Sequence, residues 1–493
     1  MELMAGEISI QQPQLIGLTE PATDILDIIL DHFQFMDLKA LHLTCRRISR
    51  TAKPRLFEDY YLGFFSSSVT RFAELATKRP DIARHIKSFT LVLGCLPAFG
   101  EIEQWENLVD CRPPVSLFYR DYHQYECDAC TSARDECCRR AWVKVYEGKR
   151  HSFGVSELVA GWTAYNDLLH DQRSWDDSHD QMLAEGISAL PSLRAVKVDA
   201  IQLSDNNRKP IWYSMVRRAL IGPDNWIYTM FNRGDRLRRQ FKPQRALLRA
   251  TLERGKRNDV SGLKELVLPD NQVPLPYGLQ IPANGKSYPG LEFITDLDLF
   301  FTHIVSVAED DEPESLRNSN RIFTELCWLL SSTPSVKRLR LVASEDSDAF
   351  PEAYDRFSQD FPRRLDPISW PSLERLSLGC EASADSLLIF LRRHASTLKS
   401  LHLIDLILLP GTGTWQDVIA QLPTFLHLDE YYFEGLLGDA EEIDGLFMSG
   451  TGQEDEYHYA LDNFMLRGGP LPDLYAEGSG VVTGTANYVP VTC

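Results

Sequence analysis

Metal-binding residue types gather in one short stretch, which contains His123, Cys127, Cys130, Cys137 and Cys138. Two residues separate Cys127 from Cys130, and this spacing lets two thiolates reach one tetrahedral zinc ion. The second pair fits such a site poorly, because Cys137 and Cys138 are adjacent and only six residues separate the pairs. Free thiols in a surface insert are therefore the favoured interpretation. Cys127, Cys130, Cys137 and His123 are the candidate ligands of the alternative, a structural zinc site.

The other reactive residues form no recognisable catalytic motif. The sequence contains no His-Glu-x-x-His of a zinc hydrolase, no Gly-x-Ser-x-Gly elbow and no dinucleotide-binding glycine loop. The fragment Gly285-Lys286-Ser287 lacks the upstream glycine and strand of a phosphate loop, so we expect an ordinary turn there. We expect a protein with no catalytic residues and no cofactor. A cysteine protease is the alternative, because its Cys and His can be brought together by the fold without any recognisable spacing in the sequence.

Charge is distributed unevenly along the chain. Ten basic residues lie between Arg233 and Arg257, and an acidic run extends from Glu309 to Glu314. A net charge of -19 opposes binding to a phosphate backbone, so we interpret the basic stretch as a solvated helix face rather than a nucleic-acid site. The acidic run is expected to be an exposed loop. We predict no nucleic-acid partner.

The sequence also predicts a location inside the cell. The segment from Met1 to Gln14 has no basic region followed by an apolar one, and no stretch reaches the roughly 18 apolar residues that a spanning helix needs. Ten cysteines in 493 residues are too sparse for a disulfide scaffold. We expect a cytoplasmic or nuclear protein with no membrane contact.

A weak repeat runs through the longer part of the chain. Its pattern is apolar, two residues, apolar, one residue, apolar, as in Leu373-Glu374-Arg375-Leu376-Ser377-Leu378. Eight copies begin at Ile86, Leu193, Leu263, Ile294, Val336, Leu373, Leu398 and Leu428. The later intervals approach those of leucine-rich repeats, in which each short strand extends one parallel sheet.

Segments between the copies have helical periodicity, for example from Asn320 to Ser331 and from Ser383 to Ala395. Strands that alternate with helices predict an α/β fold, here an irregular leucine-rich-repeat-like solenoid of short parallel strands and helices. Residues between the apolar positions, such as Glu374, Ser377, Lys399 and His402, would then lie on the concave face, where a protein substrate would bind. Separate α/β domains are the alternative.

The N-terminal segment is apolar on more than one side. Twelve of the twenty residues from Asp24 to Leu43 are apolar, which exceeds the single stripe of an amphipathic surface helix. Asp37 is placed to cap a second helix, on which apolar residues recur up to Ile48. One face would pack on the rest of the chain and the other on a second protein. A helical cap on the repeats is the alternative.

Four short runs carry a resemblance to a known family. They are Asp24-Ile25-Leu26-Asp27-Ile28-Ile29-Leu30, then Asp37-Leu38-Lys39-Ala40-Leu41, then Leu43-Thr44-Cys45-Arg46-Arg47, followed by Pro54-Arg55-Leu56-Phe57. This order and spacing resemble the F-box of filamentous-fungal F-box proteins. The resemblance implies a small helical segment that docks on the linker subunit of a cullin-RING ubiquitin ligase, while the C-terminal region recruits a protein substrate.

The linker-contacting residues implied by this resemblance are Pro21, Ile25, Leu26, Ile29, Leu38, Leu41, Cys45 and Ile48. The family usually begins with Leu-Pro, one residue and Glu, whereas here Pro21 follows Glu20. This difference favours the alternative of a leucine-rich-repeat scaffold or interaction protein that is not part of a ligase and carries an N-terminal helical cap.

The expected organisation follows from these patterns. The segments are a flexible N-terminus (1–14), an F-box-like helical segment (15–62), a linker helix with the first repeat strand (63–98), an insert with the cysteine cluster (99–186), a leucine-rich-repeat-like region (187–437) and an acidic, then flexible, C-terminal tail (438–493). The expected function is that of a substrate-recognition adaptor of a Skp-cullin-F-box type ubiquitin ligase. Such an adaptor acts by proximity and needs no acid, base or nucleophile of its own.

Overall fold

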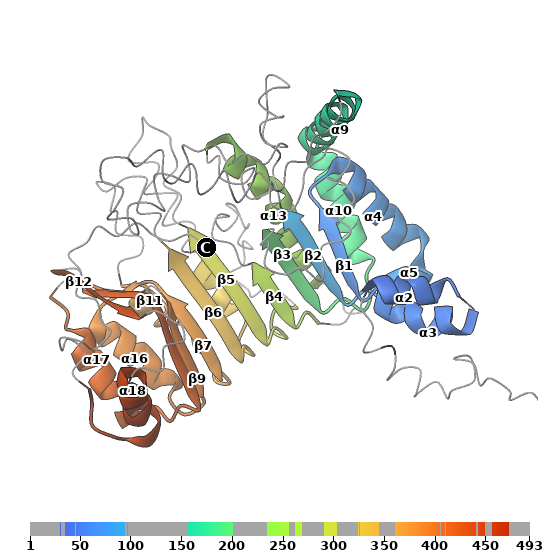
Figure 1. The fold of residues 1–493 in the computed structure, drawn as a ribbon. Helices are drawn as coiled ribbons and strands as arrows, with labels where there is room; N and C mark the ends of the chain where they lie inside the picture. Colours follow the sequence, from blue (N-terminus) through green and yellow to red (C-terminus); the bar gives the residue numbers. More distant parts are fainter. Residues whose placement is uncertain are drawn as a thin grey trace, which may run out of the picture.

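The chain has a mixed α/β fold built on one long parallel sheet (Figure 1). The computed structural model describes residues 30, 35–44, 46–93, 96, 155–200, 234–255, 262–268, 290–302, 324, 326–344, 360–404, 406–409, 411–439, 442–448 and 456–472. Helices α2 (Phe35–His42) and α3 (Arg46–Leu56) precede the sheet and lie beside the end where its first strand begins. The predicted α/β class is therefore confirmed.

Nine strands of the sheet run parallel, in the order in which they occur along the chain. They are β1 (Asp59–Gly63), β2 (Ser88–Leu93), β3 (Ala195–Ala200), β4 (Glu265–Leu268), β5 (Asp296–Thr302), β6 (Arg338–Ser344), β7 (Arg375–Gly379), β9 (Ser400–Ile404) and β11 (Glu430–Asp439). All eight copies of the sequence pattern lie on these strands, β2 to β7, β9 and β11. The pattern therefore correctly predicted a strand at each copy and a parallel sheet.

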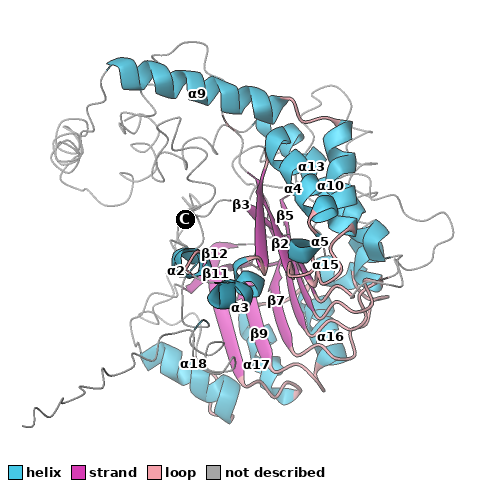
Figure 2. Cartoon of the chain, turned by 90° about the vertical axis from the view of Figure 1, so that its right-hand side faces the viewer, coloured by secondary structure: helices cyan, strands magenta, loops and turns pink. Residues whose placement is uncertain are grey.

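The apolar positions of the pattern build the core. At β7, for example, Leu373 just before the strand and Leu376 and Leu378 within it are all buried. The equivalent residues of the neighbouring strands belong to the same apolar cluster. Figure 2 shows the helices that cover this face of the sheet, among them α4 (Ser66–Lys78), α10 (Asp177–Ser188), α13 (Gly234–Gly255) and α16 (Ala384–His394). Because successive side chains of a strand alternate between faces, the residues between the apolar ones point away from these helices.

Helix α16 shows how local sequence sets an element. Ser383 takes an extended backbone conformation, and its side chain accepts a hydrogen bond from the backbone N–H of Ser386 at 3.3 Å, as an N-cap does. Apolar side chains recur at helical spacing after it, and Leu387, Phe390 and Leu391 are fully buried against the sheet. The helix predicted from Ser383 to Ala395 is confirmed, as is helical structure over residues 326–331 of the other predicted segment.

One backbone carbonyl per strand aligns each strand with the next. The carbonyl of Lys87 accepts hydrogen bonds from the N–H groups of Arg194 at 2.7 Å and Ala195 at 3.0 Å. This pairing occurs eight times in all between Glu58 and Asp429, always with the second residue of the pattern as acceptor. The second residues of all nine strands therefore form a single row at the edge where the strands begin.

The sheet begins one strand before the sequence analysis placed it. Strand β1 pairs with β2 in register, Asp59 opposite Ser88 and Leu62 opposite Leu91. The pattern does occur there, as Phe57, Tyr60 and Leu62, but Phe57 also ends the run Pro54-Arg55-Leu56-Phe57 that carries the family resemblance, and the residues up to 62 are expected to be helical.

The helical segment itself differs from the expectation. Instead of one helix capped by Asp37 and continuing to Ile48, α2 already includes Asp37 and ends at His42, and α3 starts at Arg46. The hydroxyl of Thr44 donates to the carbonyl of Leu41 at 2.7 Å, and this side-chain bond satisfies the end of α2 and breaks the helix.

Further elements complete the C-terminal end. Short strands β8 (Glu381–Ala382) and β10 (Ile407–Leu408) follow β7 and β9 along the chain and pair parallel with each other, and β10 also pairs parallel with β11. Strand β12 (Glu442–Met448) pairs antiparallel with β11. Helix α18 (Glu456–Arg467) buries Leu461 and Met465 in the main core. Strand β12 and helix α18 thus lie within residues 438–493, the segment expected to be an acidic, then flexible, tail.

Candidate interaction surfaces

The N-terminal helices form a small unit with an apolar centre of its own. Leu30, Leu38 and Ala52 make up this centre, and Leu41 and Leu56 pack at its side. No residue of it belongs to the large cluster under the sheet. We call α2 and α3 together the helical pair.

Polar contacts tie the helical pair to the sheet. Lys53 Nζ lies 2.5 Å from Asp81 Oδ2, and Asp81 is also bonded by Arg79, whose Nε lies 3.0 Å from Oδ1. These hydrogen bonds, from Arg79 first and then from Lys53, hold the pKa of the Asp81 carboxyl well below its usual range. Asp81 belongs to the short helix α5 (Pro80–Ala83), which leads into β2. The pair is thus held against the beginning of the sheet.

Three of the predicted linker-contacting residues lie within the described part of the chain. Leu38 is 7% exposed and Ile48 5%, so the chain itself already covers both side chains. Leu41 is half-buried. The other predicted contacts lie outside the described residues, and they are Pro21, Ile25, Leu26, Ile29 and Cys45.

The most exposed large apolar side chain in the described part of the chain was not among the predicted contacts. Leu43 is 78% exposed and lies in the turn between α2 and α3. Helical periodicity placed no emphasis on it, because a turn residue belongs to no helix face. Leu43 is therefore an apolar side chain beside the helical pair that a second protein could contact directly.

The face of the sheet opposite the helices is polar and carries ion pairs across neighbouring strands. Lys197 Nζ lies 2.7 Å from Glu265 Oε1 between β3 and β4, and Arg338 pairs with Asp296 between β6 and β5. We call this surface the open face. The charged side chains of this face are the residues that stand between the apolar positions of the pattern.

One carboxyl group on the open face is largely removed from water. Burial raises the pKa of Asp298 above its ordinary value, and Arg340 opposes this effect at a distance of 3.5 Å. On the last strands, β9 and β11, the open face carries ring side chains. His402 and Tyr432 pack edge to face there, with ring centroids 4.8 Å apart. Ser377 and His402, which sequence placed on a shared face, lie opposite each other in the register of β7 and β9.

A glycine shapes the far end of this face. A Cβ on Gly379 would lie 2.4 Å from the carbonyl oxygen of Ile404 and 3.0 Å from a methyl carbon of Val342. Val342 and Ile404, two strands apart, meet over it and are both buried. Only a residue without a side chain lets these strands approach so closely.

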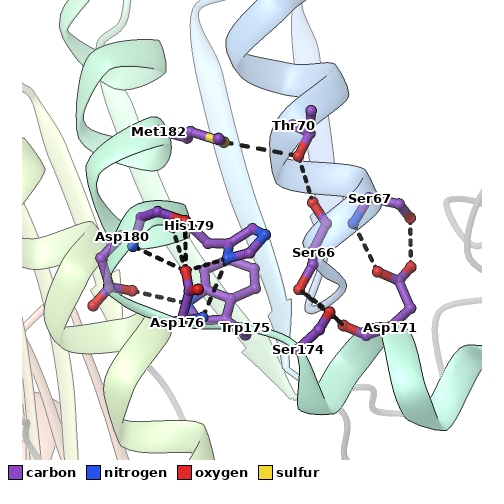
Figure 3. Close-up of polar contacts among 11 residues, drawn as sticks. Ser66, Ser67, Thr70, Asp171, Ser174, Trp175, Asp176, His179, Asp180 and Met182 are labelled. Atoms are coloured by element: carbon purple, nitrogen blue, oxygen red, sulfur yellow. Dashed lines mark hydrogen bonds and ion pairs between the residues drawn. The ribbon is translucent and has the colours of Figure 1, made fainter.

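Serine, histidine and aspartate side chains cluster where three helices meet (Figure 3). The carboxylate of Asp171, near the end of α9 (Val155–Arg173), accepts from the backbone N–H of Ser67 at 2.9 Å and from its hydroxyl at 2.5 Å. Asp171 thereby caps the start of α4 from a distant part of the chain. Helix α9 extends from this junction past the strand ends (Figure 2).

The second half of the cluster caps α10. Asp176 Oδ1 lies 2.7 Å from His179 Nδ1 and accepts from the Ser178 hydroxyl at 2.6 Å. These hydrogen bonds, from Ser178 first, lower the pKa of Asp176 to about 2. The Ser178 hydroxyl donates to Asp176 and not to His179, and the lowered pKa of Asp176 makes this carboxylate a weak base. The arrangement is that of a helix cap.

The remaining sequence candidates are placed as follows. The possible zinc ligands Cys127, Cys130, Cys137 and His123 lie outside the described residues, and so does the acidic run from Glu309 to Glu314. The described part of the chain contains no group of three or more His, Cys, Asp or Glu side chains positioned to hold a metal ion. None of the helices within it combines the length and the apolar character needed to cross a bilayer.

The basic stretch forms α13, whose apolar side is buried against its neighbours. Arg249 is exposed, whereas Arg254 is 2% exposed and bonds to backbone carbonyls. Part of the basic stretch is therefore structural rather than solvated.

Comparison with known proteins adds no relative to this picture. No family model matches the chain, and no curated protein matches it significantly in sequence.

Proposed function

We propose that this chain is a substrate-recognition adaptor of a Skp-cullin-F-box type ubiquitin ligase. The helical pair would dock on the linker subunit, and the sheet region would recruit a protein substrate. The observation that carries the proposal is the helical pair itself, a unit with its own small core that exposes Leu43 and stands at the beginning of the sheet. The pair lies within residues 15–62, where the sequence resemblance leads us to expect a small helical docking segment.

The strand order favours the repeat interpretation of the rest of the chain. Nine strands are added one after another, in register, by the same carbonyl pairing. Each strand with its following segment acts as one repeat, and we infer a leucine-rich-repeat-like solenoid whose open face holds the substrate. The single unbroken core under all nine strands argues against separate α/β domains.

One observation favours a second candidate, a repeat scaffold that is not part of a ligase. Leu38 and Ile48, two of the residues expected to contact the linker, are already buried within the chain. Helices that keep their apolar residues covered and stand before the first strand fit a terminal cap of a repeat array. The two candidates differ in whether the exposed surface around Leu43 binds another protein.

Co-purification of the full chain with the linker and cullin subunits separates the candidates. Leu43→Asp places a charge on the proposed contact without touching a buried side chain, and Ile389→Asp makes the same change at a 51% exposed position on α16. We expect the intact chain and Ile389→Asp to recover both subunits, and Leu43→Asp to lose them. Failure of the intact chain to recover the linker would leave the scaffold candidate.

A further inference from the structure

The row of residues at the beginning of the strands has an uneven charge. The carbonyl pairing aligns the second residues of the pattern, which are Glu58, Lys87, Arg194, Lys264, Thr295, Lys337, Glu374, Lys399 and Asp429. Five of the seven interior members are basic and one is acidic, in a chain whose net charge is -19. We call Lys87, Arg194, Lys264, Lys337 and Lys399 the basic row.

Two members of the basic row are neutralised within the chain. Lys87 Nζ lies 3.0 Å from Glu58 Oε1, and Lys337 Nζ lies 2.9 Å from Glu374 Oε1.

The other three members are exposed, and among the described residues none of them forms an ion pair with an acidic side chain. They are Arg194, Lys264 and Lys399. Lys264 lies 5.7 Å from the centre of the Phe293 ring, a residue that is itself 48% exposed.

A neighbouring arginine adds to this charge. Arg375 stands one position further along, on β7, and is 64% exposed, with its nearest acidic partner, Glu430, at 3.9 Å. At that distance and exposure the pair contributes little, so the arginine is available to a ligand. The unneutralised charge thus extends over strands β3 to β9.

The geometry of the row fits an extended ligand. Neighbouring strands lie about 4.8 Å apart, so the five strand steps from Arg194 to Lys399 span about 24 Å. An extended polypeptide rises about 3.3 Å per residue, and roughly eight residues would cover this distance.

Acidic residues within the row decide between classes of ligand. Glu58 and Asp429 stand at its two ends, and Glu374 stands between Lys337 and Lys399. A nucleic-acid strand would bring a phosphate against these carboxylates, because its charges recur without a break. A polypeptide can place neutral residues opposite them and acidic residues opposite the free cations.

We infer that the basic row binds an acidic, extended segment of a partner protein. The binding is electrostatic and weakens with ionic strength, because the cations are exposed. The inference goes beyond the proposed function and does not rest on it, since it needs neither the helical pair nor a ligase subunit.

Binding of a fluorescent peptide of about twelve residues with alternating Glu and Ser tests the inference on the full chain. The test variant carries Arg194→Ser, Lys264→Ser and Lys399→Ser. The control carries Arg71→Ser, Arg173→Ser and Arg249→Ser, which removes the same charge from exposed positions on helices α4, α9 and α13. An oligothymidylate of equal charge is the competing ligand.

We expect the peptide to bind the intact chain and the control variant equally, and the test variant about tenfold more weakly, because three exposed ion pairs are lost. Absence of peptide binding, or equal weakening by both variants, would overturn the inference. Tighter binding of the oligothymidylate than of the peptide would also overturn it and make the row a nucleic-acid surface.

Discussion

The guanidinium Nη2 of Arg254 lies 3.1 Å from the carbonyl oxygen of Leu190 and donates a hydrogen bond to it. The same nitrogen reaches the carbonyls of Leu193 at 3.1 Å and Pro191 at 3.4 Å. These carbonyls belong to the turn between α10 and β3, where regular backbone pairing is interrupted. One buried side chain from α13 therefore satisfies the turn that starts a strand of the sheet.

Replacing Arg254 should destabilise the whole sheet region. Arg254→Met leaves buried carbonyls without a donor, and we expect a loss of about 3 kcal/mol in the free energy of unfolding. Arg249→Met changes an exposed residue of the same helix and should alter it by less than about 0.5 kcal/mol. Urea denaturation followed by circular dichroism measures both, and equal effects would contradict the structural role of Arg254.

The glycine between Val342 and Ile404 should tolerate no side chain. Gly379→Ala places a methyl group against the backbone oxygen of Ile404, and forcing the strands apart should cost about 2 kcal/mol. Ser377→Ala, on the same strand and the same face, meets no such obstacle. Thermal unfolding of the two variants compares them directly. A Gly379→Ala variant as stable as the intact chain would show that β7 and β9 are not as close as the structure has them.

A buried histidine should make stability depend on pH. Burial, and secondarily Arg393, lowers the pKa of His394 below its ordinary value of 6.5, and its ring packs beside Trp370 and Phe390. The unfolded chain then takes up the proton first, so this contribution to stability is fully present above pH 6.5 and is lost as the pH falls toward the lower pKa of the folded state.

His394→Phe keeps an aromatic ring at this position and removes the titration. Unfolding free energies of the variant, measured between pH 7.5 and 5 with intervals of about half a unit, should fall less steeply than those of the intact chain. Parallel curves would show that His394 does not titrate differently in the two states.

The helical pair should unfold without the sheet. Leu38→Ala removes a buried side chain from the small centre shared with Leu30 and Ala52, and we expect a local loss of about 3 kcal/mol. Hydrogen exchange should then accelerate in α2 and α3, while β5 and β6 keep the protection of the intact chain. Faster exchange in both regions would mean that the pair and the sheet fold as one unit.

The sheet could be predicted from sequence because its signal is local and repeated. Each copy of the pattern, such as Leu398-Lys399-Ser400-Leu401-His402-Leu403, specifies one strand with a buried face, and all eight copies lie on strands. A ninth copy of the pattern begins at Phe57 and predicts strand β1 in the same way. The apolar residues before it favoured a helical interpretation. Strand β12 does not carry the repeated apolar pattern. It pairs antiparallel with β11, and nothing in the local sequence specifies this pairing.

The candidate surfaces were harder to predict. The family resemblance implied Leu38 and Ile48 as contacts, but both lie at the helical spacing that marks buried residues, and the chain covers them itself. Helical spacing gave no reason to choose Leu43, whose exposure depends on the turn at Thr44. The alignment of Lys87, Arg194 and Lys264 was likewise hidden, because these residues are separated by long segments and are brought into one row only by the carbonyl pairing.

The proposed function requires that the helical pair docks on the linker subunit. Its most direct test is the mass in solution of the intact chain mixed with purified linker subunit, measured by light scattering during size exclusion. We expect one species with the combined mass of one copy of each protein. Two separate species, at concentrations where a known F-box protein forms the complex, would contradict it.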